Sequence, residues 1–476
     1  MKKIAYIASE CVPFIKTGGL ADVVGTLPKI FDKREYDVRV IIPNYACIPA
    51  KYKDKMRDIT HFQMDIGDHS QYVGIKYLEY EGVTVYFIDS EFYFGGTTPY
   101  ADVKWDIEKF SYFSKAALSI LPAIGFRPDI LHCHDWQAGL VPVYLKTLFA
   151  GNPFYSGMRS IMTIHNLQFQ GRWNYGHMKY CTGLPDYLFT ADKMEIYNDA
   201  SMLKGGLVYA DTITTVSNTY AYEIQTPYFG EGLDGLLQAR RKSLVGIVNG
   251  IDYDIYNPER DKNLAKPYNV ETLAKNRPKN KRALQKELGL PVDDNQFVLG
   301  IISRLTDQKG LDLVDAVMND ICQDGVQFIV LGTGNPHYEN MFRYYQEFHP
   351  AKVSANISFS DALSHKMYGG CDAILVPSRF EPCGLTQLMA LRYGALPIVR
   401  ETGGLKDTVA PYNEFEQSGT GFSFANYNAH ELLDTINYAK EVFCEQKDNW
   451  RAMQIRAMQM DYSWATSARK YEELYK

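Results

Sequence analysis

Glu381 lies beside a predicted helix start, and this combination of groups suits both anion binding and stabilisation of a developing cation. The glutamate belongs to the polar loop 378–384, and a helical pattern begins around Gly384, Leu385 and Thr386. The first N–H groups of a helix have no partner inside the helix, and the helix dipole gives them positive partial charge. Thr386 adds a hydroxyl, and the carboxylate of Glu381 is an acceptor for sugar hydroxyls.

Two cations, Arg304 and Lys309, occupy the polar loop that follows the apolar run 297–302. In isolation, such a pair is more often a solvated surface feature than a ligand site. At the end of a buried strand the same pair could neutralise substrate phosphates, because ligands of α/β folds bind at the carboxyl ends of strands.

A third cation, Lys16, precedes the glycine pair Gly18 and Gly19, which lies between the apolar run 4–8 and a helical pattern. A strand, a glycine-rich turn and a helix form a layout that cradles phosphate. The segment is neither GxGxxG nor a Walker sequence, so it lacks the fingerprint of a dinucleotide or P-loop site. A glycine pair that only permits a tight turn is the alternative interpretation.

Polar side chains also end two apolar runs in the first half of the chain: His132, His134, Asp135, His165 and Asn166. Residues at such strand ends build the sites of α/β proteins. His132 and His134 share one face of a strand. Their spacing is too short for an open metal site without distant ligands, so no metal is expected.

A regular alternation of short apolar runs and helical segments positions these residues, and it predicts parallel, doubly wound α/β sheets. The strands predicted in the first half are 4–8, 38–42, 83–88, 130–133, 160–164 and 212–216, and the helices include 110–124 and 138–149. The polar segment 252–281 reads as linker and surface. A second alternation follows, with strands predicted at 297–302, 328–331, 373–376 and 396–399 and a helix at 385–393.

Composition limits the class of protein. A length of 476 residues suggests two to three domains, and 46% hydrophobic with 22% charged residues describes a globular chain. A net charge of −6 and the lack of a Lys/Arg block argue against nucleic acid as a partner. The eight cysteines form no CxxC pair, which favours a reducing cytoplasm. Glu10 and Pro13 interrupt the first apolar run, so no signal peptide is expected. No apolar segment approaches the ~20 residues that a membrane-spanning helix needs, so no membrane span is expected either.

Five motifs, taken together and in this order, resemble the bacterial and plant-type glycogen (starch) synthase family. They are K-T-G-G-L at 16–20, H-D-W-Q-A-G-L at 134–140, T-I-H-N-L at 163–167, S-R-L-x-x-Q-K-G at 303–310 and P-S-R-F-E-P-C-G-L-T-Q at 377–387. Broader relatives among retaining two-domain glycosyltransferases often carry a second Glu eight positions after the first. Met389 stands at that position here, which fits the synthase family better than its cousins.

The resemblance implies a retaining glucosyltransferase of the glycosyltransferase B architecture, with two Rossmann-like α/β domains facing across a deep cleft. Such an enzyme extends an α-1,4-glucan (glycogen) from its non-reducing end with ADP-glucose, in the cytoplasm and without a metal or other cofactor. The implied catalytic residues are Glu381, His165, Asp135, Arg304 and Lys309. Donor binding is implied for Lys16, Gly18, Gly19, Arg304, Lys309, Phe359, Cys383, Gly384, Leu385 and Thr386, and a place on the sugar and acceptor side for Tyr100, Asn166 and Asn249.

The resemblance also implies domain bounds: an acceptor-side domain at 1–246, a nucleotide-sugar-binding domain at 247–455, and a helix at 456–476 that crosses back to the first domain. Phe359 stands where relatives often place Tyr, which leaves the choice of base open. A UDP-glucose-dependent glucosyltransferase and a catalytically silent glucan-binding relative remain alternatives. A glucan phosphorylase would need a pyridoxal phosphate lysine and is usually much longer.

Overall fold

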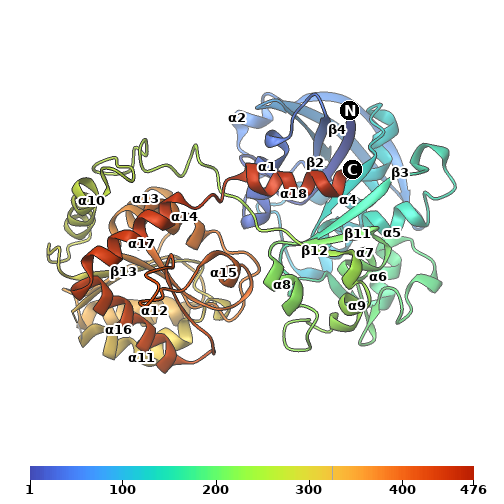
Figure 1. Cartoon of the computed structure of the whole chain (residues 1–476). Helices are drawn as coiled ribbons and strands as arrows, with labels where there is room; N and C mark the ends of the chain where they lie inside the picture. Colours follow the sequence, from blue (N-terminus) through green and yellow to red (C-terminus); the bar gives the residue numbers. More distant parts are fainter. Residues whose placement is uncertain (324) are drawn as a thin grey trace. The chain divides into compact units, whose positions relative to one another are not determined.

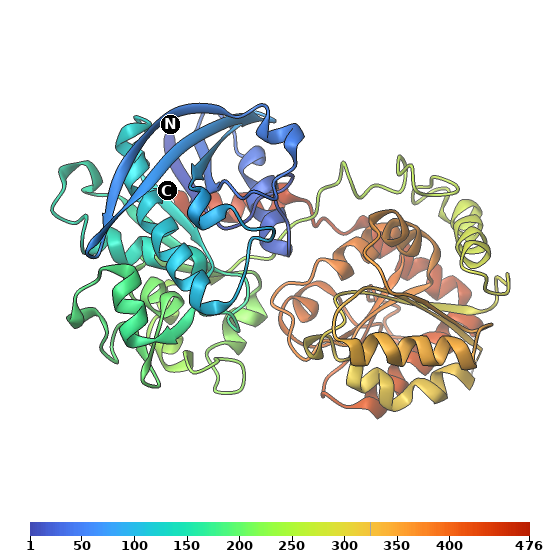
Figure 2. The same cartoon turned by 180° about the vertical axis from the view of Figure 1, so that it is seen from behind.

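The computed structural model describes residues 1–323 and 325–476, and they form two compact units (Figures 1 and 2). Unit 1 comprises Met1–Val216, Ala221–Ile247 and Ser467–Lys476, and unit 2 comprises Ser217–Tyr220 and Val248–Thr466. The chain therefore passes from unit 1 to unit 2 near residue 248 and returns near residue 467.

The sheet of unit 1 has the strand order β12-β11-β7-β6-β1-β2-β5-β4-β3, and it is parallel from β12 to β5. Its central strands are almost wholly buried, as expected for near-continuous apolar runs covered on both faces. The parallel strands are β1 (Lys2–Ile7), β2 (Tyr36–Pro43), β5 (Val83–Asp89), β6 (Ile130–His134), β7 (Arg159–Ile164), β11 (Thr212–Thr215) and β12 (Leu244–Gly246).

A long antiparallel hairpin, β3 (Arg57–Ile66) and β4 (His69–Tyr80), extends this sheet beyond β5. The sequence analysis did not predict these strands. Most of β3 is solvent-exposed and polar, so it lacks the continuous apolar run by which the parallel strands were recognised.

The helices of unit 1 follow its strands in sequence. The predicted helix 110–124 is longer in the structure, because α4 already begins at Val103, where Asp102 accepts a hydrogen bond from the Trp105 N–H. The helices are α1 (Gly19–Ile30), α2 (Ala50–Lys53), α3 (Glu91–Phe94), α4 (Val103–Ala123), α5 (Leu140–Lys146), α6 (Tyr175–Thr182), α7 (Met202–Tyr209), α8 (Asn218–Glu223), which unit 2 shares, and α9 (Asp234–Ala239). A small antiparallel sheet joins β8 (Arg172–Asn174), β10 (Asp199–Ser201) and β9 (Glu195–Ile196).

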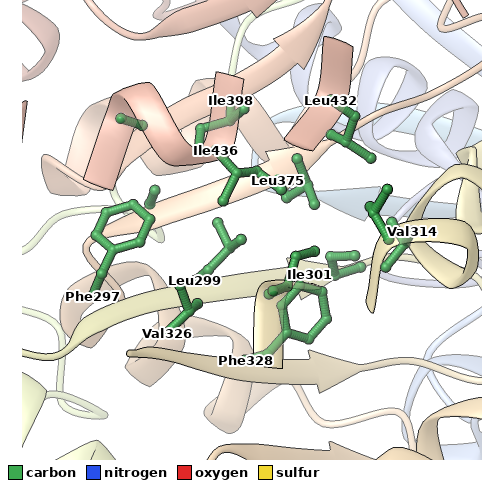
Figure 3. Close-up of a cluster of buried hydrophobic side chains, with 14 of the residues drawn as sticks. Phe297, Leu299, Ile301, Val314, Val326, Phe328, Leu375, Ile398, Leu432 and Ile436 are labelled. Atoms are coloured by element: carbon green, nitrogen blue, oxygen red, sulfur yellow. The ribbon is translucent and has the colours of Figure 1, made fainter. Parts of the chain in front are cut away.

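The sheet of unit 2 is parallel throughout its described strands, in the order β15-β14-β13-β16-β17-β18. On one face, side chains from alternate positions of the strands pack with Val314 of α11 and Leu432 and Ile436 of α16 (Figure 3). The strands are β13 (Phe297–Ile302), β14 (Val326–Leu331), β15 (Val353–Asn356), β16 (Ala373–Val376), β17 (Leu396–Arg400) and β18 (Phe422–Phe424).

The other face of this sheet packs against a second apolar cluster, to which Leu273 and Leu284 of α10 contribute. Within the predicted linker 252–281, α10 begins at Leu273, so the last part of that segment is helical. The helices of unit 2 are α10 (Leu273–Glu287), α11 (Leu311–Gln323), α12 (Pro336–Phe348), α13 (Asp361–Gly370), α14 (Thr386–Tyr393), α15 (Gly403–Thr408), α16 (Ala429–Glu445) and α17 (Lys447–Gln459).

The sequence analysis predicted one helix over the C-terminal segment 456–476, but the structure divides this segment between two helices. Residues 456–459 complete α17, and a separate helix, α18 (Trp464–Tyr475), follows a short break. None of the described helices is both long and apolar enough to cross a bilayer.

Candidate functional site

Glu381 lies in the loop after β16, where it forms an ion pair with Lys309. The distance from Lys309 Nζ to Glu381 Oε2 is 2.7 Å, and the Ser378 hydroxyl donates to the same oxygen at 2.8 Å. Glu381 is 7% exposed. The Lys309 amine and the Ser378 hydroxyl both contact this carboxylate, and a polar group at this depth is costly unless it has such partners. The predicted loop glutamate is therefore a buried, oriented group rather than a solvated one.

The helix start beside Glu381 keeps its first N–H groups uncapped by a side chain. Leu385 is the N-cap of α14 and makes no capping hydrogen bond through its side chain. Gly384 has φ +72°, a left-handed conformation that favours glycine, and a Cβ there would displace the Gln387 side chain, whose Oε1 would lie 2.4 Å away. These N–H groups lie at the helix end that the sequence analysis predicted to bind an anion, and no N-cap side chain occupies them.

A small pocket of about 60 Å³ opens at this point, and Lys309, Glu381, Gly384 and Thr386 are among its lining residues. Ser303 and Gln387 also line it, and within the described chain Ser303 Oγ and Gln387 Oε1 are buried without a hydrogen-bond partner. Buried polar atoms of this kind usually have partners in a complete site. The pocket therefore offers unused polar groups next to the ion pair.

Other predicted donor residues of unit 2 differ in exposure. Arg304 is exposed in the loop after β13, and Phe359 is 90% exposed after β15. Cys383 is buried against the backbone of Asn249, and burial raises the pKa of its thiol to about 12. Within the described residues Asn249 Oδ1 is buried without a partner. Cys383 is thus a neutral packing residue, and Arg304 and Phe359 are the accessible groups.

The Glu381 loop is held by donors to its backbone carbonyls, which the sequence analysis did not predict. The Gly404 N–H donates to the Glu381 carbonyl at 3.0 Å, and Arg400 donates to the carbonyls of Ser378, at 2.9 Å, and Arg379. A Cβ on Gly403 would lie 1.9 Å from the Glu381 carbonyl oxygen. Residues 402–405 have the sequence T-G-G-L, which also occurs at 17–20.

In unit 1, Asp135 joins the ends of β6 and β7. Its Oδ1 accepts hydrogen bonds from the backbone N–H groups of His165, at 2.7 Å, and Asn166, at 3.5 Å. Asp135 has φ +56°, an uncommon conformation for a residue with a side chain. Burial raises the pKa of Asp135 from 3.8 to about 7, although the two N–H donors oppose this shift. The structure thus brings three predicted site residues together.

The imidazoles of His134 and His165 contact each other, with 3.0 Å between His134 Nδ1 and His165 Nε2. Burial lowers the pKa of His165 to about 3 and that of His134 well below 6.5, so both rings are neutral at pH 7. His132 instead bonds to Thr163 and Tyr475. Within the described residues, no three His, Cys, Asp or Glu side chains converge as metal ligands.

The glycine-rich turn of unit 1 is organised by Glu10, a residue that the sequence analysis did not assign to the site. Its carboxylate accepts from the Thr17 N–H, from Thr17 Oγ1 at 2.5 Å and from the Gly18 N–H at 3.4 Å. The Tyr100 hydroxyl donates to Glu10 at 2.5 Å, which fixes Tyr100 at the same turn. Glu10 is 3% exposed. Its partners lie as far as 90 residues away in sequence, so no local pattern reveals it.

Lys16 remains accessible at this turn. It pairs with Asp22 at 2.8 Å, and both side chains are partly exposed. A Cβ on Gly18 would meet nothing within 4 Å, so the space in front of Gly18 is open. An exposed ion pair is weak, and a bound anion could take Lys16 from Asp22 at little cost.

Comparison with known proteins matches two family models to the chain. Residues 3–239 match the starch synthase catalytic domain, and residues 281–451 match glycosyl transferases group 1. A glycogen synthase from Lachnospira eligens is 63% identical over 100% of this chain and 99% of its own length. One from Lachnoclostridium phytofermentans is 58% identical over 100% of this chain and 99% of its own length.

Among solved structures, the catalytic domain of starch synthase IV from Arabidopsis thaliana, bound to ADP and acarbose, is similar over the whole chain. Its TM-score is 0.91 with 33% sequence identity, and the match covers 100% of this chain and 98% of that one.

Proposed function

The chain belongs to the glycogen synthase family of glycosyltransferases, and from this premise we propose that it transfers glucose from ADP-glucose to the non-reducing end of an α-1,4-glucan with retention of configuration. The expected two-domain α/β glycosyltransferase B fold is confirmed by the sheets and the family matches. The observation that supports the activity most directly is the Lys309–Glu381 ion pair beside the uncapped start of α14.

In the proposed mechanism the cationic groups stabilise the leaving diphosphate. Negative charge develops on a nucleoside diphosphate as the glycosidic bond breaks, and fixed cations with aligned N–H groups stabilise it. The proposal gives this role to Lys309, Arg304 and the N–H groups at the start of α14. It also assigns Lys16 to the donor phosphates, because its motif at 16–20 resembles that of the family. The diphosphate then leaves without needing a proton.

Glu381 stabilises the positive charge that develops on the sugar. The anomeric carbon becomes oxocarbenium-like as the leaving group departs, and an oriented carboxylate stabilises positive charge that exists fully only in the transition state. The bond from Ser378 fixes one carboxylate oxygen, which leaves Glu381 pre-oriented. Neutral His165 exchanges hydrogen bonds with sugar hydroxyls and adds no charge, and Asp135 holds the chain at His165 through its backbone N–H.

The proposal includes no metal ion or other cofactor, because side-chain cations and helix N–H groups neutralise the negative charge of the diphosphate. It places the protein in the cytoplasm. Free thiols at every cysteine of the described residues support a reducing compartment.

The test is transfer of radiolabelled glucose to glycogen, with ADP-glucose and UDP-glucose compared as donors. The proposal predicts a higher kcat/KM for ADP-glucose and label released by an exo-acting α-1,4-glucan hydrolase. Equal kcat/KM for the two donors would overturn the donor assignment, and Phe359, which lacks the hydroxyl of a tyrosine, would be the first residue to examine. No transfer from either donor would leave the silent glucan-binding alternative.

A further inference from the structure

The last turn of α18 places Tyr475, the next-to-last residue of the chain, inside unit 1. Tyr475 is 0% exposed. Its hydroxyl lies 2.5 Å from the hydroxyl of Tyr6 on β1 and 2.8 Å from Nδ1 of His132 on β6. A hydroxyl with two buried partners fixes the direction of both, because an unpaired buried polar group is costly.

The hydrogen bonds continue across the sheet from His132. Its Nε2 lies 2.7 Å from Thr163 Oγ1 on β7, and Thr163 Oγ1 lies 2.6 Å from Thr214 Oγ1 on β11. These side chains are all 0% exposed. Hydrogen bonds in a low-dielectric interior polarise and align one another, so both ring nitrogens of His132 are held and the plane of its ring is fixed.

The fixed ring of His132 in turn supports the histidine that meets His165. The rings of His132 and His134 are stacked, with centroids 4.4 Å apart and an angle of 21° between their planes. Tyr6 packs against both rings, at 4.7 Å and 5.2 Å between centroids. His134 Nδ1 then bonds to His165 Nε2. The described contacts thus form one continuous series from the C-terminal helix to His165.

We propose that Tyr475 is a positioning residue for His165, acting through His132 and His134, so that α18 sets the geometry of the sugar-facing histidine. The inference rests on the proposed function of His165. It assigns to α18 a role in turnover in addition to its packing on unit 1.

The decisive variant is Tyr475→Phe, which keeps the ring and removes the hydroxyl. The expected result is a loss of about tenfold in kcat with KM for ADP-glucose within about twofold, since misplacement of a site group by ~1 Å can cost about 10²-fold in rate. The matched control is Tyr144→Phe, which removes another fully buried hydroxyl of unit 1, bonded to the Thr182 carbonyl at 2.9 Å. The control should lower Tm similarly and leave kcat unchanged.

A double-mutant cycle with His165→Ala tests the positioning role of Tyr475 separately from the proposed function of His165. If Tyr475 acts through His165, Tyr475→Phe has no further effect on kcat in the His165→Ala background. An equal fold-loss in both backgrounds, or an unchanged kcat in the single variant, would overturn the positioning role. A wild-type kcat in His165→Ala would instead overturn the proposed function of His165.

Thr163→Val tests the same series from its other side should Tyr475→Phe fail to fold. It removes the hydroxyl that bonds His132 Nε2 and keeps a branched side chain of similar size. Its effect on kcat should again disappear in the His165→Ala background, and an additive loss would count against the proposal.

Discussion

In the loop after β16, Glu381 forms an ion pair at 2.7 Å with Lys309 from the loop after β13, whereas at the ends of β6 and β7 the rings of His134 and His165 are neutral. Both sites lie at the carboxyl ends of parallel strands, so the fold alone does not explain the difference. The partners do: in unit 2 donors surround the carboxylate, whereas in unit 1 the buried ring of His134 contacts the partly buried ring of His165.

Under the proposed function, this difference separates two tasks of glucosyl transfer. The ion pair beside the helix start is assigned to the groups whose charge changes during reaction, the diphosphate and the anomeric carbon. Neutral imidazoles suit sugar hydroxyls, whose charge does not change and whose hydrogen bonds specify identity and orientation.

The largest effect is expected for Glu381→Gln. In the proposed mechanism the substitution removes the carboxylate that stabilises the transition state, so kcat should fall by at least about 10²-fold with a near-normal KM for ADP-glucose. Steady-state kinetics measures both constants. Glu431→Gln, the same change in a helix of the same unit where Glu431 bonds Asn426, should leave kcat unchanged. A wild-type kcat with a raised KM would reduce Glu381 to a substrate-binding residue.

Lys309→Ala should mainly weaken donor binding, with KM for ADP-glucose raised about tenfold or more, because charge-assisted hydrogen bonds contribute about 1.5–3 kcal/mol. Product inhibition by ADP should weaken in parallel. Lys366→Ala, which breaks a surface ion pair with Glu287, serves as the control. An unchanged KM in Lys309→Ala would mean that Arg304 and the helix start hold the phosphates without it.

Glu10→Gln should have a smaller effect, a few-fold rise in KM for ADP-glucose together with a lower Tm. Both carboxylate oxygens of Glu10 accept hydrogen bonds, and an amide nitrogen in place of one oxygen leaves a buried donor unpaired. Kinetics and thermal unfolding report the two effects. Glu79→Gln at an exposed hydrogen bond to Thr84 should change neither, and a Glu10→Gln variant with wild-type KM would detach this turn from donor binding.

Asp135 predicts a pH-dependent stability difference. Its pKa is raised from 3.8 to about 7 in the folded protein, so the folded state binds a proton that the unfolded state has already lost. This contribution to stability is full below about pH 4 and is lost as pH rises through about 7. Relative to Asp135→Asn, which cannot titrate, the wild type should lose about 1 kcal/mol or more between pH 5 and pH 8. Denaturant unfolding at both pH values measures this, and a constant difference would contradict it.

Removal of divalent metal ions with EDTA is expected to have no effect on activity. If side-chain cations neutralise the diphosphate, activity in EDTA should match activity in buffer, with Lys309→Ala giving the size of a real loss of phosphate contacts. Turnover lost in EDTA and restored by Mg²⁺ or Mn²⁺ would show that the charges of unit 2 are insufficient, and Asp135 would be the residue to test as a ligand.

Local sequence patterns predicted the parallel strands well. The strands expected at 297–302 and 373–376 match β13 and β16 residue for residue, because a run buried on both faces is continuously apolar. The hairpin of β3 and β4 was missed since most of its positions on β3 face solvent. The positions of Glu381 and Lys309 in loops also agree with the prediction, because each lies in the polar segment that follows a recognisable strand.

The supports of the site could not be predicted in the same way. Glu10 meets Tyr100 from 90 residues away, and Arg400 reaches the loop at 378–379 from a strand whose pattern marks it only as apolar. Such contacts depend on which strands become neighbours. A single sequence contains no periodic signal for them.

The close approach of Gly403 and Gly404 to the Glu381 loop bears on attempts to engineer donor preference. Any Cβ at these positions would collide with backbone atoms of residues 381–383 at 2.0 Å or less, so randomised libraries that include them would be filled with misfolded or inactive clones. Phe359, which is 90% exposed, carries no such restriction. A library confined to Phe359 and the solvent-facing positions around it leaves the geometry of the Glu381 loop intact while the nucleotide specificity is explored.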